Sequence, residues 1–142
     1  MLGLSGYQKR RLDMQYEGGY KYQLKKDEVI ETGITGYMIA SDYATLDSSG
    51  KLTIFKGYAW DGCSGPTYDC DKSMTPSLAH DTLYCLMQDG LLPSDCKTLA
   101  DNLFYKLLID RKFNLGRARA YFIAVVLFGK TERKKRDIKE VV

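Results

Sequence analysis

The spacing of apolar residues changes once along this chain, near Gly57, and that change limits the folds the sequence can adopt. Before Gly57 the apolar runs are short, alternate with polar residues and are rich in β-branched and aromatic side chains, as strands are. From Pro76 onward the runs are longer and recur at helical spacing. We therefore expect an α+β fold, in which a small N-terminal antiparallel β-sheet of hairpins or a meander precedes a C-terminal half of three helices.

Turn residues separate the strands of the expected sheet. The sequence Asp-Ser-Ser-Gly at residues 47–50 lies between two of the short runs and predicts a hairpin. Gly33 and Gly36 mark another junction. The strands are expected at residues 20–24, 29–34, 37–39, 43–46 and 52–55.

Capping residues and glycines define the expected helices. The first helix should open near Pro76, with Thr75 or Ser77 as its cap, and should end before Gly90. Two further helices are expected at residues 93–112 and 116–128. The third contains the apolar run AYFIAVVLF, which is too short to span a bilayer. We expect this third helix to lie in the centre of the core, with an interfacial role as the alternative.

The composition is that of one soluble globular domain. A chain of 142 residues, 44% hydrophobic and 27% charged, can bury a core of its own. The expected parts are an N-terminal arm (residues 1–19), the β-sheet (20–58), a motif loop (59–75), the three helices (76–129) and a charged tail (130–142).

Charge and cysteine usage narrow the classes of partner. A net charge of +3 is too small to indicate a nucleic-acid-binding protein. The N-terminus lacks a charged start followed by an apolar run, so we expect synthesis and folding in a cytoplasm. The sequence is also compatible with a protein that contacts a membrane without spanning it, and with a homo-oligomer. The cysteines lack any CxxC pair, and free thiols are expected rather than a disulfide or metal ligands, at Cys63, Cys70, Cys85 and Cys96.

Candidate chemistry centres on His80, the single histidine of the chain. On a helix Tyr84 lies one turn away on the same face, whereas Asp81 points about 100° away. Asp101 lies beside an apolar stripe of the second helix, where a carboxylate needs a partner. We expect Asp101 to accept a hydrogen bond from one imidazole nitrogen of His80, leaving the other nitrogen to take a proton from water. The alternative is a histidine with a structural role.

A glycine-bearing loop before the first helix is the second candidate site. Its residues of interest are Trp60, Asp61, Gly62, Ser64, Gly65 and Pro66. Asp61 and Asp81, together with carbonyl oxygens of this loop, are ligands that suit calcium. Joined by His80 they could instead hold a transition metal such as zinc, which is the weaker signal. Trp60 is expected to pack in the core rather than to contact a ligand. The alternative for Asp61 is that it only makes a turn, and Ser64 lacks the spacing of a nucleophile elbow.

Four segments carry a resemblance to a known family: KLTIFKGYAWDGCSGPTYD, SLAHDTLYCLMQDGLLP, ADNLFYKLL and RARAYFIAVVLFG. With their WDGxSGP, HDxLY and ADxLF motifs in that order, they resemble the small phage and prophage proteins called the domain of unknown function 1353, over residues 20–129. No established activity comes with that family. The resemblance implies a bacteriophage protein made in the host cytoplasm and incorporated in the virion, most of all at the tail, with other virion or tail proteins as partners.

The sequence HDTLY is also similar to the HDxCY helix of secreted phospholipases of the A-two type. Carried over to this chain, the similarity makes His80 the general base and Asp101 its orienting carboxylate. It makes Asp81 a calcium ligand and Tyr84 a support. The loop departs from that pattern, because it lacks the phospholipase spacing of glycines, and the usual disulfide partners are missing. The similarity implies a small metal-assisted hydrolase of lipid or cell envelope, with a divalent metal, calcium rather than zinc.

Overall fold

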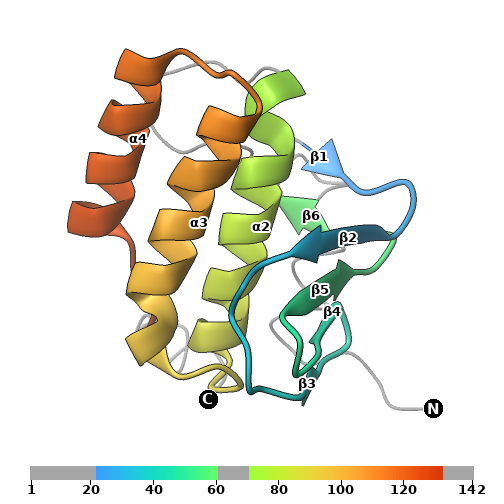
Figure 1. Ribbon diagram of the computed structural model, residues 1–142. Helices are drawn as coiled ribbons and strands as arrows, with labels where there is room; N and C mark the ends of the chain where they lie inside the picture. The colour runs from blue at the N-terminus through green and yellow to red at the C-terminus, as the bar shows by residue number, and fades with distance from the viewer. Residues whose placement is uncertain (1–21, 61–70, 133–142) are drawn as a thin grey trace, which may run out of the picture.

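The protein has an α+β architecture, in which an antiparallel sheet is followed by three helices (Figure 1). The computed structural model describes residues 22–60 and 71–132. The strands are β1 (Tyr22–Gln23), β2 (Glu28–Glu31), β3 (Ile39–Ala40), β4 (Ala44–Leu46), β5 (Lys51–Ile54) and β6 (Ala59–Trp60). The helices are α2 (Asp71–Gln88), the 3-10 turn η2 (Ser94–Cys96), α3 (Lys97–Asp110) and α4 (Leu115–Phe128).

The main sheet has four antiparallel strands in the order β2-β5-β4-β3, and β1 pairs separately with β6. The hairpin between β4 and β5 is confirmed. Asp47 Oδ1 accepts hydrogen bonds from the backbone N–H groups of Ser49 and Lys51, both at 3.0 Å. Gly50 closes the turn with φ +94°, a conformation that favours glycine. Strand β6 was not predicted. Its residues 59–60 were expected to belong to the motif loop, but they pair with β1.

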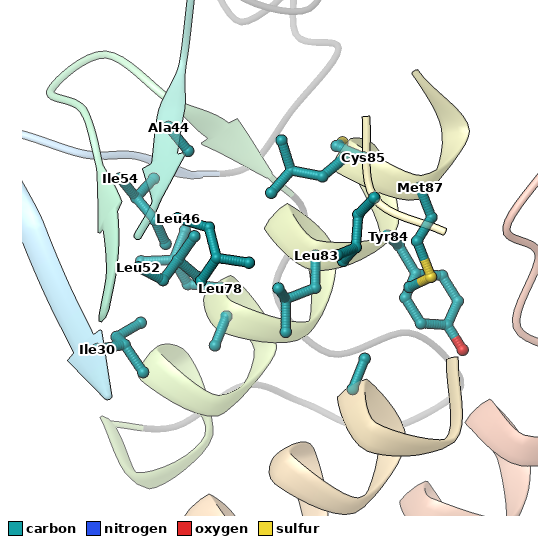
Figure 2. Close-up of a cluster of buried hydrophobic side chains, with 14 of the residues drawn as sticks. Ile30, Ala44, Leu46, Leu52, Ile54, Leu78, Leu83, Tyr84, Cys85 and Met87 are labelled. Carbon is teal, nitrogen blue, oxygen red and sulfur yellow. The ribbon is translucent and has the colours of Figure 1, made fainter. Parts of the chain in front are cut away.

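The core lies between the sheet and α2 (Figure 2). Alternate residues of β5, Leu52 and Ile54, are fully buried, as the period of two predicts for a sheet with one covered face. They meet Leu78 and Leu83 of α2. Figure 2 shows the ring of Tyr84 on the side of α2 away from these sheet residues, with its hydroxyl pointing toward the other helices.

The three helices stand side by side, with α3 between α2 and α4 (Figure 1). Between α3 and α4 lies a second, smaller cluster of buried residues, Phe104, Leu108, Phe113, Ala118 and Tyr121. The short connection after Gly90, whose φ is +76°, reverses the chain between α2 and α3. Within residues 22–60 and 71–132, no helix is both long and apolar enough to cross a membrane.

The predicted start of the first helix is wrong. Helix α2 begins at Asp71, so Thr75 and Ser77 lie inside it instead of capping it. Pro76 is its sixth residue and withholds one N–H, the donor that the carbonyl of Lys72 would otherwise receive. One missing bond near the start of an 18-residue helix is outweighed by the burial of the apolar residues that follow, among them Leu78, Leu83 and Leu86.

The prediction that the third helix forms the centre of the core is also wrong. Within α4 the buried side chains are Ala118 and Tyr121, whereas Ile123, Leu127 and Phe128 are exposed. The helix packs on α3 along one narrow stripe and leaves most of its apolar surface uncovered by the described residues. An apolar run of this length has no polar face to reveal which side is buried.

Candidate functional site

Helix α2 places His80 and Tyr84 one turn apart on the face that looks toward α3. Their ring centroids lie 4.2 Å apart, and the His80 ring also contacts Phe104 of α3, with centroids 4.9 Å apart. The predicted stacking of the two side chains is therefore confirmed. Packing between two aromatic rings fixes the orientation of the imidazole plane.

Asp101 of α3 receives both of these side chains. His80 Nε2 lies 2.7 Å from Asp101 Oδ1, and the Tyr84 hydroxyl donates to the same oxygen at 2.6 Å. The predicted proximity of Asp101 and His80 is thus confirmed. Only 2% of the Asp101 side chain is exposed, against 13% for His80, so water reaches the histidine but not the carboxylate.

Lys97 completes the set of partners around Asp101. Its Nζ donates to Asp101 Oδ2 at 2.8 Å and to the backbone carbonyls of Val125 and Val126 at 3.0 Å each. Both carbonyls belong to the last turn of α4, and that of Val125 also accepts the backbone N–H of Gly129 at 2.9 Å. A positive charge is favourable there because the helix dipole places negative charge at that end. One ammonium group therefore joins α3, α4 and the buried carboxylate.

Burial and these hydrogen bonds together determine the ionisation of Asp101. Burial alone would raise its pKa, but the hydrogen bonds from His80, Lys97 and Tyr84 outweigh burial and hold the pKa of Asp101 below its ordinary value. Burial, reinforced by the Asp101 carboxylate, raises the pKa of Tyr84 well above its ordinary value. At neutral pH the pair is therefore a carboxylate and a protonated phenol.

These charge states determine the tautomer of His80. An ionised carboxylate can only accept hydrogen bonds, so the proton between Asp101 Oδ1 and His80 must sit on Nε2. In a neutral imidazole the other nitrogen, Nδ1, is then a bare acceptor. Among the described residues, no hydrogen bond to Nδ1 of His80 is formed. Chemically this is a histidine oriented by a carboxylate and ready to take a proton.

Gly129 closes the site on the α4 side. A Cβ atom built on Gly129 would collide with the Tyr84 hydroxyl and would lie 2.6 Å from the backbone oxygen of Val125. The φ of Gly129 is −63°, so glycine is required here by close approach and not by backbone conformation. The predicted end of the helix at this residue is confirmed, and the neighbouring tyrosine explains why the residue there is glycine.

Asp81 does not belong to the Asp101 cluster, as its position on the helix predicts. Its Oδ2 accepts a hydrogen bond from the hydroxyl of Tyr58, whose oxygen also lies 3.2 Å from the Cys85 sulfur. Tyr58 is almost fully buried, and Asp81 is half-buried. Cys85 and Cys96 are free thiols, as expected; Cys63 and Cys70 lie outside the described residues.

Of the six residues named in the predicted motif loop, the structure describes Trp60. Asp61, Gly62, Ser64, Gly65 and Pro66 lie outside the described residues. Trp60 belongs to β6 and is buried, with its indole N–H donating to Ser77 Oγ at 3.0 Å, so the expectation that it packs in the core is confirmed.

A metal site therefore stays a prediction. Within residues 22–60 and 71–132 no group of three or more His, Cys, Asp or Glu side chains could hold a metal ion. The calcium site expected from Asp61 and Asp81 needs a residue outside those ranges.

The sequence did not identify Lys97, or the packing of Gly129 against Tyr84, as parts of the site. Lys97 precedes Asp101 by four residues, a spacing that brings opposite charges together on a helix. The ion pair between Lys97 and Asp101 could therefore have been predicted from the sequence. Its contacts with α4, and the approach of Gly129 to Tyr84, depend on how the helices pack and leave no local signal.

Comparison of the chain with protein-family models, with curated proteins and with solved structures finds no match.

Proposed function

We propose that the protein is a small hydrolase that acts on an ester bond of lipid or cell-envelope material, with His80 as its general base. The observation that carries the proposal is the 2.7 Å contact between His80 Nε2 and a buried, ionised Asp101. Such a contact leaves Nδ1 as the basic atom and stabilises the imidazolium that forms when it takes a proton.

In the proposed reaction a water molecule gives one proton to Nδ1 of His80 while its oxygen attacks the ester carbonyl. The imidazolium is held by Asp101, and it then returns the proton to the departing alcohol oxygen. One water is consumed, and one acid and one alcohol are formed. Asp101 and Lys97 touch neither water nor substrate in this scheme; they position and polarise the histidine.

A divalent cation is proposed as an aid to this reaction, with calcium preferred to zinc. Asp81 and Asp61 would be its carboxylate ligands, since hard cations take carboxylate and carbonyl oxygens. The cation would stabilise negative charge on the carbonyl oxygen of the substrate. This part of the proposal rests on the similarity of HDTLY to the phospholipase helix.

The test is product release by the purified protein from phospholipid vesicles and from O-acetylated peptidoglycan, whose acetyl groups are ester-linked, with calcium or zinc supplied. Replacing the base, as His80→Gln, should lower the rate by about 10²–10⁴-fold. Asp101→Asn, which removes the carboxylate that orients His80, should also lower the rate. Its matched control is Asp110→Asn, because Asp110 is an exposed aspartate of the same helix. Wild-type protein that releases nothing from either material under any of these conditions would refute the proposal.

A second candidate is a virion component, especially of the tail, in which the same cluster has a structural role. The observation that favours it is that Lys97, Asp101 and Tyr84 together connect α2, α3 and α4. The resemblance to phage proteins supports this candidate as well. It predicts that phage carrying His80→Gln assemble normal infectious particles, and that deleting residues 1–15 or 131–142 prevents incorporation. Normal particles from both deletions would argue against it.

A further inference from the structure

Helix α4 exposes apolar side chains along its outer face, and they gather toward its C-terminal end. The exposed fractions are 55% for Ile123, 45% for Val126, 66% for Leu127 and 74% for Phe128. These residues fall within one turn and a half of helix. A group of exposed apolar side chains at one end of a helix is typical of a surface that binds a partner.

The charge along the chain on either side of the patch is mainly positive. Between residues 111 and 131 the chain has no acidic side chain and five basic ones, Arg111, Lys112, Arg117, Arg119 and Lys130. Arg119 and Lys130 are exposed at either side of the patch along the chain. A helix with an apolar face and basic flanks is typical of segments that lie in the interface of an anionic bilayer.

We propose that α4 docks the protein on an anionic phospholipid surface, with Leu127 and Phe128 inserted among the acyl chains and the basic residues facing lipid phosphates. A second copy of the chain fits less well, because an α4–α4 contact would bring two such basic segments together. Helix α4 has 14 residues, so it lies on the bilayer and does not cross it.

The docking end of α4 is the end that is joined to the His80 cluster. Lys97 binds the carbonyls of Val125 and Val126, and Gly129 lies against Tyr84. A bilayer at this end would therefore lie near the candidate site. The benefit of that position for hydrolysis rests on the proposed function, whereas the docking itself does not.

The test is co-sedimentation of the full chain with phosphatidylglycerol vesicles and with phosphatidylcholine vesicles. Wild type should bind phosphatidylglycerol at least tenfold more tightly, and added NaCl should weaken the binding, as expected for attraction between basic residues and anionic headgroups. Leu127→Asp combined with Phe128→Asp should weaken binding roughly tenfold or more. Matched controls are Val29→Asp and Met38→Asp, which change exposed apolar residues of the sheet half and should bind as wild type.

Circular dichroism and thermal melting verify that each variant is folded. Absence of wild-type binding to both vesicle types, or equal binding to both without salt dependence, overturns the proposal even if the double variant does not fold. It is also overturned if wild type is a dimer that the double variant converts to monomer while vesicles stay unbound. His80→Gln should bind vesicles as wild type does. A wild-type protein that binds vesicles but releases product from neither phospholipid nor peptidoglycan refutes the proposed reaction and leaves the docking intact.

Discussion

Removing the ammonium group of Lys97 should destabilise the fold by an amount that depends on the charge of Asp101. In Lys97→Met the buried oxygen Oδ2 of Asp101 loses its 2.8 Å donor, and the last turn of α4 loses the group that binds two of its carbonyls. A hydrogen bond to a charged group contributes about 1.5–3 kcal/mol. The Lys97 side chain is 26% exposed, so solvent screens part of this attraction and the lower end of that range applies.

We therefore expect Lys97→Met to lower the free energy of unfolding by about 2 kcal/mol at pH 7. The assay is urea denaturation followed by circular dichroism, with Lys106→Met as the control, since Lys106 is exposed on the same helix. The control should change stability by less than about 0.5 kcal/mol.

A double-mutant cycle with Asp101→Asn isolates the Lys97–Asp101 interaction from the contacts with α4. The two residues should couple by about 1.5 kcal/mol at pH 7. Because the pKa of Asp101 is lowered in the folded state, its contribution is fully present above the ordinary aspartate pKa of about 4 and is lost as the pH falls through the lowered folded value. The coupling should shrink accordingly in acid. Coupling near zero at pH 7, or coupling that is unchanged in strong acid, would refute the account.

Three further substitutions test the surroundings of the cluster. Gly129→Ala should destabilise the fold by about 1–3 kcal/mol in urea denaturation, because the new methyl group collides with Tyr84. Its control Gly116→Ala, inside α4, should stabilise the fold by about 0.5 kcal/mol, because the new methyl group would lie 3.4 Å from its nearest neighbour, Asn114 Oδ1. Equal effects of the two substitutions would contradict the packing of Gly129 against Tyr84. Tyr84 has a raised pKa, so the stability it contributes is present below about pH 10 and declines above it. Tyr84→Phe should therefore lose less stability than wild type between pH 9 and 11 in alkaline melts, and parallel curves would be inconsistent with the buried phenol. Tyr58→Phe removes the donor to Asp81 and should cost about 1–2 kcal/mol in thermal melts; no change would mean that this bond contributes nothing.

The parts of the fold that follow from local sequence were predictable. The turn at residues 47–50 and the ends of two helices at Gly90 and Gly129 were placed from glycine and polar side chains alone. The pairing of His80 with Asp101 also followed, because a short connection forces two helices to pack antiparallel and a buried acid needs a donor.

The remaining features depend on tertiary packing. Pro76 looked like the start of a helix because proline is common there, yet burial of the residues after it lets α2 extend five residues further back. The apolar run of α4 does not indicate from its sequence whether the helix is buried or lies on the surface, because it has no polar stripe that would mark a solvent-facing side. Lys97 acts across two helices, and its contact with α4 joins residues 28 positions apart.

The protonation of His80 tests the central claim most directly. As the chain has a single histidine, a long-range proton–nitrogen correlation spectrum contains one imidazole and needs no assignment by mutation. At a pH where the ring is neutral, the account predicts the proton on Nε2, held by Asp101, with Nδ1 bare, and it predicts that Asp101→Asn abolishes this preference. A proton on Nδ1 in the wild type, or a tautomer mixture unaffected by Asp101→Asn, would contradict a histidine poised as a general base.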